Sequence, residues 1–148
     1  MMKKKLIWVG VGLVLVWLGW GKAYAQGLPT EAEGNYLKRS IYFGGGSYEV
    51  DPWQAREMLD FVDSLGNIEG YSITIHSYTD DIGGADYNAW LSDKRSRATI
   101  YLLLQKGIDL HQIETRDFGQ YNPIYDNNTW EGRRLNRRVD IIFWPLAM

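Results

Sequence analysis

The stretch from Tyr78 to Arg95 reads YTDDIGGADYNAWLSDKR, and the rest of the chain is interpreted from it. It opens with two acidic residues and two glycines, which are typical of a loop, and then takes on a helical pattern. A cation on the expected inner face of this helix needs an explanation. That face is formed by residues spaced three or four apart, namely Asn88, Leu91, Arg95, Ala98 and Leu102.

Arg95 has no acidic residue three or four positions away, so no ion pair within the helix is available to it. An unpaired charge at a core edge is costly, and the partner we expect is Asp80 in the preceding loop. One hypothesis is a structural Asp80–Arg95 salt bridge that fastens the loop to the helix. The other is a receptor for a zwitterion, in which Asp80 takes an ammonium and Arg95 takes a carboxylate through its bidentate fork. Spacing alone leaves both open.

The remaining sequence predicts an α+β domain in the order β-α-β-α-β-β, a two-layer sandwich with a mixed sheet and helices packed on one face. Asp51, Pro52 and Gln54 indicate a helix start with a capping box, and Gly66 marks the end of that helix. The second helix is expected from about Asp86 to Lys106. Strands are expected at 41–43, 71–78, 113–118 and 139–143, and a helical turn at 130–135.

The first 25 residues have the layout of a secretory signal peptide. Three lysines at 3–5 precede an apolar run of 15 residues, Leu6 to Trp20, and Ala23-Tyr24-Ala25 forms a small-residue cleavage site. The alternative is an uncleaved anchor, although the run is shorter than the ~20 residues that a bilayer span needs. We therefore expect a signal peptide at 1–25, a flexible lead-in at 26–39 and a folded domain at 40–146.

Charge and cysteine content exclude several classes of function. Removing residues 1–25 removes four of the 16 basic residues, and 12 basic against 18 acidic residues give a net charge of −6. Such an exported acidic chain is not expected to bind nucleic acid. The sequence contains no cysteine, which excludes a disulfide framework, a thiolate metal site and a lipidation cysteine. We expect no cofactor and no integral outer-membrane domain.

An ordered set of residues resembles the OmpA-like C-terminal domain, the peptidoglycan-binding module of outer-membrane protein A, the peptidoglycan-associated lipoprotein and the flagellar stator proteins. The resemblance covers about Ile41 to Phe143. One departure is Ser77-Tyr78, where the family usually has Gly-His. The matching residues are Thr79-Asp80, Gly83, Asn88, Leu91-Ser92, Arg95, Gly107, Gly119, Pro123, Gly132-Arg133 and Asn136-Arg137-Arg138-Val139.

The resemblance implies a β-α-β-α-β domain that binds peptidoglycan without cutting it. In the family, the positions of Asp80 and Arg95 hold the meso-diaminopimelate of the stem peptide. Thr79, Asn88 and Leu91 would line the same pocket, with Arg138 close to it. We expect Asp80→Ala and Arg95→Ala each to remove wall binding and to leave the fold intact.

The resemblance also predicts an exported protein of the periplasm, associated with the cell wall or the outer membrane, with envelope proteins as further candidate partners. The alternative is a structural subunit of an envelope complex, of motor or secretion type, that no longer depends on peptidoglycan.

His76 and His111 have no nucleophile or ligand cluster at a catalytic spacing, so an enzyme is not expected. Trp90 and Trp130 could stack on sugar or peptide, or pack against the helices.

Overall fold

A mixed sheet of four strands, in the order β1-β4-β2-β3, forms one layer of the domain. The structure is a computed structural model that describes residues 36–146, so the predictions for residues 1–25 and for most of 26–39 fall outside the described residues. β4 pairs antiparallel with β1 and β2, whereas β2 and β3 are parallel. The elements are β1 (Leu37–Tyr42), α1 (Pro52–Ser64), β2 (Tyr71–Tyr78), α2 (Ala85–Leu104), β3 (Ile113–Gly119), α3 (Trp130–Asn136) and β4 (Arg138–Pro145).

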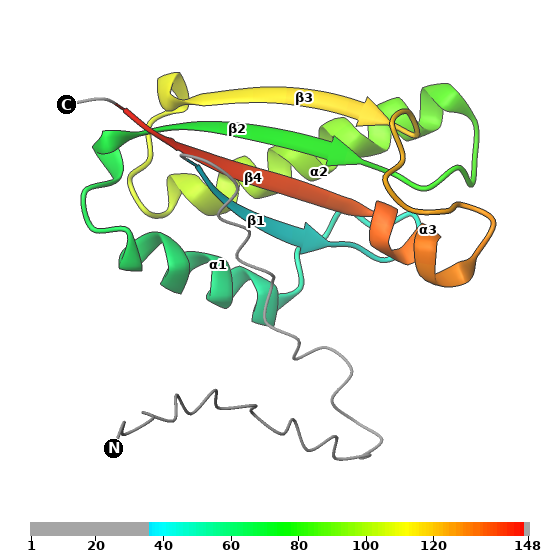
Figure 1. Cartoon of the computed structure of the whole chain (residues 1–148), viewed down its shortest axis with the longest axis horizontal. Coiled ribbons are helices and arrows are strands. Elements are labelled where there is room, and N and C mark those ends of the chain that lie inside the picture. Colours follow the sequence, from blue (N-terminus) through cyan, green and yellow to red (C-terminus); the bar gives the residue numbers. More distant parts are fainter. Residues whose placement is uncertain (1–35, 147–148) are drawn as a thin grey trace, which may run out of the picture.

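α1 and α2 pack against one face of this sheet, as Figure 1 shows. Ile73 and Ile75 of β2 and Ile141 of β4 point toward the helices and are fully buried, together with Met58 and Leu103 from the two helices. Successive side chains of a strand point to opposite faces, so the alternation in the sequence predicted this inner face. The predicted α+β class, with helices on one side of a mixed sheet, is confirmed.

The start of α1 follows the sequence signals, except at Gln54. The Asp51 carboxylate accepts hydrogen bonds from the backbone N–H groups of Trp53 and Gln54, and Pro52 occupies the first helical position. The predicted capping box is wrong, because the Gln54 side chain bonds instead to the backbone N–H and C=O of Tyr42, at 2.8 and 2.9 Å. This pair of bonds fastens α1 to the end of β1.

β1 is longer than the strand predicted at 41–43. It begins at Leu37, which lies opposite Phe143 of β4, and therefore starts before the domain boundary expected at Ser40. Lys38 and Arg39 interrupt the apolar pattern that marks a strand in the sequence. Pairing with the central strand β4 supplies the backbone hydrogen bonds that the local sequence does not reveal.

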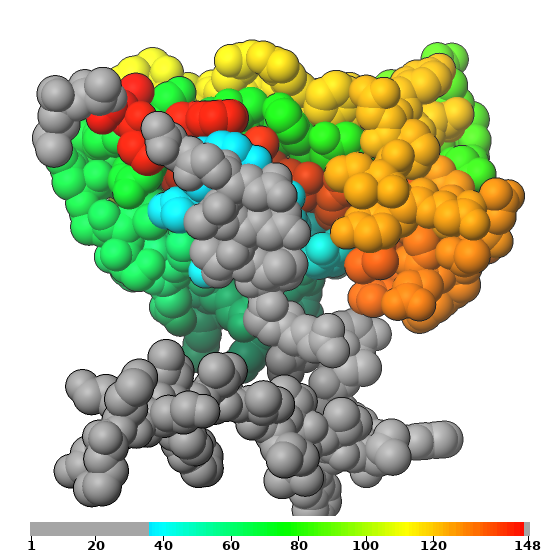
Figure 2. Space-filling view, viewed as in Figure 1, coloured from blue at the N-terminus to red at the C-terminus, as the bar shows by residue number. Residues whose placement is uncertain are grey.

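The C-terminal ends of β1, β2 and β3 meet at one end of the sheet, where β4 begins (Figure 1). α2 also begins at this end, and the segment from 120 through α3 forms a lobe over it in Figure 2. The motif residues of the sequence therefore gather at a single end of the domain. No helix in residues 36–146 is long and apolar enough to cross a membrane.

Candidate functional site

Arg95 lies fully buried on α2 and donates three hydrogen bonds to backbone carbonyls. Its Nε bonds to Ser47 O at 2.9 Å, its Nη1 to Tyr78 O at 2.9 Å and its Nη2 to Gly44 O at 3.0 Å. The guanidinium also lies 5.0 Å from the ring centroid of Phe43. Arg95 therefore ties three segments together, namely α2, the end of β2 and the loop at 43–50.

Burial lowers the pKa of Arg95 to about 10, partly offset by the negative charge of Asp80 and reinforced by Arg137. The guanidinium remains charged at neutral pH. Three of its five N–H groups serve the carbonyls, which leaves one N–H on each terminal nitrogen. Those two N–H groups are sufficient in number for the two oxygens of a carboxylate.

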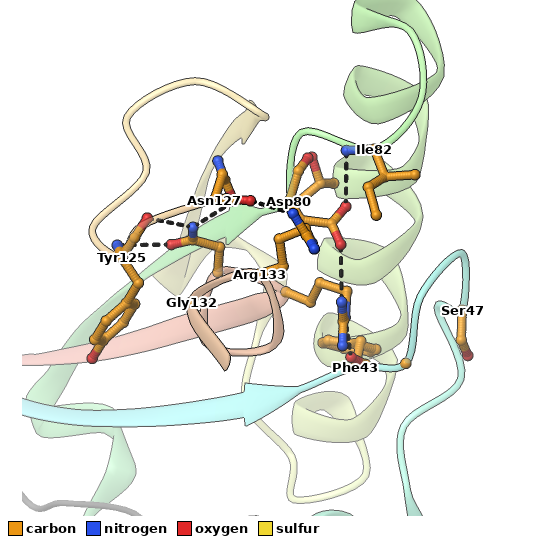
Figure 3. Close-up of polar contacts among 12 residues, drawn as sticks. Phe43, Ser47, Asp80, Ile82, Tyr125, Asn127, Gly132 and Arg133 are labelled. Atoms are coloured by element: carbon orange, nitrogen blue, oxygen red, sulfur yellow. Dashed lines mark hydrogen bonds and ion pairs between the residues drawn. The ribbon is translucent and has the colours of Figure 1, made fainter. Parts of the chain in front are cut away.

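Asp80 follows the end of β2 and forms its ion pair with Arg137 rather than with Arg95. Its Oδ2 accepts from Arg137 Nη1 at 2.9 Å and its Oδ1 from Ile82 N–H at 3.3 Å, as Figure 3 shows for the Asp80 carboxylate. The Arg137 Nε donates to Phe43 O at 3.2 Å, so the same cation also contacts the start of the loop at 43–50. The hypothesis of a structural salt bridge was correct for Asp80 and wrong for its partner, which is Arg137 and not Arg95.

Arg137 is the residue that sequence reasoning missed at this site. It directly precedes β4 and lies in the run Asn136-Arg137-Arg138-Val139, from which only Arg138 was selected. The alternation of side chains along β4 is the sequence signal that could have distinguished Arg137 from Arg138. Val139 faces the helices, so Arg138 faces the opposite side of the sheet, whereas Arg137 stands before the strand at its end.

Arg138 lies on the sheet face that α1 and α2 do not cover. Its Nε donates to both carboxylate oxygens of Asp140 at 3.1 Å, and its guanidinium lies 4.2 Å from the Tyr78 ring centroid. The Ser40 hydroxyl completes the cluster by donating to Asp140 Oδ1 at 2.7 Å. Arg138 is therefore held in a buried ion pair on the face away from Arg95.

Thr79, next to Asp80, and Asn88 and Leu91, on α2, are all buried. The Thr79 hydroxyl donates to Asp80 O at 2.8 Å, and its backbone N–H donates to Gly119 O at 2.7 Å. Asn88 Nδ2 donates to Gln120 Oε1 at 2.8 Å, whereas Asn88 Oδ1 has no hydrogen-bond partner in the described structure. The site thus contains one buried acceptor without a donor, which is uncommon in folded proteins.

α3 and the loop before it are held by Asn136, as the contacts of Tyr125 and Asn127 in Figure 3 show. The Asn136 side chain accepts from the N–H groups of Ile124 and Tyr125, and donates to Tyr125 O and Asn127 Oδ1. A fully buried asparagine with all of these partners fixes the residue that precedes Arg137. The Arg137 guanidinium is thereby held against Asp80.

The described residues contain no group of three or more His, Asp or Glu side chains that could hold a metal ion. His76 lies on β2 with its ring against Phe118, and His111 is exposed beside Asp109. The assembled groups are instead a carboxylate flanked by guanidinium groups. Such an arrangement can bind charged and polar ligands through charge-assisted hydrogen bonds.

The described residues thus form a two-layer α+β domain with a buried acid just after β2 and a buried arginine inside α2. Residues 42–137 match the OmpA family, and the chain belongs to that family. It is similar to the probable lipoprotein YiaD of Escherichia coli, with 32% identity over 110 residues, which are 74% of this chain and 50% of that relative.

Two further relatives carry descriptions that concern the cell wall. The peptidoglycan-binding protein ArfA of Mycobacterium tuberculosis is 33% identical over 102 residues, covering 69% of this chain and 31% of that protein. The crystal structure of the peptidoglycan-associated lipoprotein from Burkholderia pseudomallei superposes with a TM-score of 0.66 at 28% identity, over 71% of this chain and 89% of that one. The chain spans half or less of the length of the curated relatives that it matches most strongly.

Proposed function

We propose that this protein binds peptidoglycan non-covalently, through the diaminopimelate of the stem peptide, and associates with the cell wall of the bacterial envelope without cutting it. The observation that carries the proposal is the nearly buried Asp80 carboxylate, held at the end of β2 beside two guanidinium groups. Membership of the OmpA family supports it, as do relatives described as peptidoglycan-binding and peptidoglycan-associated.

The free end of diaminopimelate carries an ammonium and a carboxylate on one carbon, so its receptor needs an acceptor and a donor a few ångströms apart. Asp80 supplies the acceptor, because a carboxylate has about four lone-pair sites and only two of them are used here. Asn88 Oδ1, which has no donor in the described structure, is a second acceptor for the ammonium.

The carboxylate of the ligand would bind the two remaining N–H groups of Arg95. Since Arg95 is fully buried, the loop at 43–50 would have to shift for the ligand to reach it. Arg137, with 13% of its side chain exposed, is the more accessible cation and would attract the carboxylate first. Thr79 and Leu91 would form the pocket wall, whereas Arg138 would act from the opposite sheet face by fixing the start of β4.

A second candidate is a structural subunit of an envelope complex that keeps the fold without the ligand. The observation that favours it is the bonding of Arg95 to three of the protein's own carbonyls. This bonding gives Arg95 a role in the folded state that needs no peptidoglycan. The two candidates differ at Asp80, because only the wall-binding protein requires a carboxylate that accepts an ammonium.

The test is co-sedimentation of residues 26–148 with isolated peptidoglycan that contains diaminopimelate. Asp80→Asn removes the charge and keeps the shape, and Asp81→Asn is its matched control because Asp81 is the adjacent, exposed acid. A charge-assisted hydrogen bond contributes ~1.5–3 kcal/mol, so Asp80→Asn should weaken binding at least about tenfold. Wild type and Asp81→Asn should sediment with the wall.

Free diaminopimelate should release the wild-type protein from the wall. A stem tripeptide with lysine in place of diaminopimelate should not, because the free end of its side chain carries an ammonium and no carboxylate. Sedimentation of Asp80→Asn at the wild-type level would contradict the assigned pocket. A well-folded wild type that stays in the supernatant would contradict wall binding itself and favour the structural subunit.

A further inference from the structure

Three aromatic side chains beside the Asp80 loop are exposed and take no part in the core. Tyr48 from the loop at 43–50 and Tyr87 and Trp90 from the first turns of α2 are 44%, 45% and 46% exposed. The Trp90 ring centroid lies 5.7 Å from that of Tyr87 and 5.9 Å from that of Tyr48. Tyr87 is tilted by 31° to Trp90, whereas Tyr48 meets Trp90 edge to face at 88°. These three adjacent residues are called the aromatic platform.

The platform is held in place by the contacts that build the candidate pocket. Arg95 binds Ser47 O, directly before Tyr48, so the same guanidinium fixes the loop against α2. Figure 3 shows Ser47 on this loop, near Phe43 and the Asp80 site. Tyr87 and Trp90 are therefore preorganised on α2, which reduces the entropy lost on binding, whereas Tyr48 moves with the loop at 43–50 when the ligand reaches Arg95.

Two glycines bring the platform into direct contact with the Asp80 loop. A Cβ atom on Gly46 would lie 3.4 Å from the Tyr87 hydroxyl, and one on Gly83 would lie 3.1 Å from Tyr87 Cδ1. Both glycines have positive φ, at 68° and 104°, which favours glycine at these turns. Because Gly83 belongs to the loop that begins with Asp80, platform and pocket share one continuous surface.

We propose that the aromatic platform binds a sugar ring of the glycan strand whose stem peptide occupies the Asp80 pocket; this inference rests on the proposed function. The C–H face of a pyranose is apolar and flat, and Trp and Tyr offer flat apolar faces with polar tips. Lys94, whose Nζ lies 5.8 Å from the Trp90 ring centroid, supplies a cation at the rim for sugar oxygens or carboxylates of the wall.

The geometry of the ligand fits this arrangement. Diaminopimelate is the third residue of the stem peptide and binds by the far end of its side chain, so the linker lets the sugar lie up to roughly 15 Å from the pocket. From the start of α2 to Trp90, five residues rise about 8 Å along the helix. A protein partner would need roughly 800 Å² on this side, far more than three half-exposed rings offer.

The experiment compares two matched ligands by calorimetry, a diaminopimelate-containing tripeptide and the same tripeptide attached to its disaccharide. For the wild type we expect the disaccharide to improve affinity roughly three- to tenfold, by analogy with the strength of aromatic contacts. Trp90→Ala should reduce this ratio to about one and leave the affinity for the bare tripeptide unchanged. Trp130→Ala is the control, because Trp130 is an exposed tryptophan on α3, outside the platform.

Trp90→Phe keeps an aromatic face and should retain most of the sugar effect, which separates stacking from a loss of folding. Equal affinity of the wild type for both ligands would overturn the inference, whereas the proposed Asp80 pocket for the peptide would remain supported. Loss of both ligands in a folded Trp90→Ala would also overturn it, because Trp90 would then act through the peptide pocket. Failure of the wild type to bind either ligand would overturn the proposed function, and the inference with it.

Discussion

Arg95 illustrates at the scale of one residue how a buried cation is accommodated without an ion pair of its own. Its three hydrogen bonds to carbonyls replace water, and the nearby Asp80 carboxylate contributes a favourable charge interaction. The sequence-based expectation that Arg95→Ala leaves the fold intact does not follow from this geometry. An arginine whose hydrogen bonds join three segments stabilises the fold whether or not a ligand binds.

We therefore expect Arg95→Ala to destabilise the domain by about 3 kcal/mol or more, because three carbonyls, one buried and two partly buried, lose a charged donor. Arg95→Lys keeps the charge and should also destabilise, because an ammonium cannot reproduce the planar fork. The measurement is the free energy of unfolding in urea. Arg97 is an exposed arginine on the same helix, so Arg97→Ala should leave the urea unfolding curve unchanged. An Arg95→Ala variant with the same unfolding curve as the wild type would contradict the stabilising role of Arg95.

His76 gives a second prediction at this scale, concerning pH. Burial lowers the pKa of His76, Arg116 lowers it further, and Asp140 partly opposes the shift. Between the unfolded pKa of about 6.5 and the lower folded pKa, the unfolded chain binds more protons, so acidification destabilises the fold. The stabilising contribution is present above about pH 6.5 and is lost as the pH falls through the folded pKa.

The urea midpoint should therefore decrease from about pH 7.5 to about pH 5.5, and His76→Gln should reduce that decrease. His111→Gln is the control, because His111 is exposed at the turn before β3 and should leave the wild-type pH dependence in place. An unchanged pH dependence in His76→Gln would assign the acid sensitivity to other groups.

At the scale of elements, α3 is docked so closely onto the preceding loop that only glycine fits at one position. A Cβ atom on Gly132 would lie 1.9 Å from Asp126 O and 2.8 Å from the Thr129 hydroxyl oxygen, which caps the helix. Neither backbone nor cap can move without separating α3 from the loop. The contact explains why a short helix keeps a glycine inside it.

Gly132→Ala should therefore destabilise the domain by roughly 1–3 kcal/mol, as overpacking does, and weaken wall binding because Arg137 follows α3 directly. Gly70→Ala is the matched control, since nothing lies within 4 Å of its hypothetical Cβ. Thermal unfolding and wall co-sedimentation measure the two effects. A stable Gly132→Ala that still binds the wall would show that the loop yields without disturbing Arg137.

At the scale of the whole molecule, the domain and the wall are both negatively charged. The chain without residues 1–25 has a net charge of −6. Attraction between the whole molecule and an anionic polymer therefore cannot drive binding. Under the proposed function, recognition would come from the local arrangement of Asp80 with its guanidinium neighbours.

Raising the salt from about 0.1 M to about 0.5 M should accordingly change the bound fraction little, because short contacts in a nearly buried pocket are weakly screened. Co-sedimentation with the wall at each salt concentration measures this bound fraction. If the partly exposed arginines of α3 drive attachment instead, binding should decrease steeply with salt and in Arg134→Ala.

Local signals in the sequence determined most of the elements and part of the site. The alternation at Ile73 and Ile75 specified a strand with one buried face, because successive side chains point to opposite sides. Asp51 and Gly66 delimited α1, because a cap and a positive φ depend on residues next to them in the chain. The helical spacing placed Arg95 on the inner face of α2, and the ordered motif indicated the family.

Only the tertiary structure decided what these residues contact. The carbonyls that bind Arg95 belong to residues 17, 48 and 51 positions away, and the partner of Asp80 is 57 positions away. Such contacts depend on how strands and loops from distant parts of the chain meet at one end of the sheet. That meeting joined Arg137 to Asp80 and placed Tyr48 against Trp90. Periodicity describes one element at a time, whereas these pairings exist only after the elements have packed.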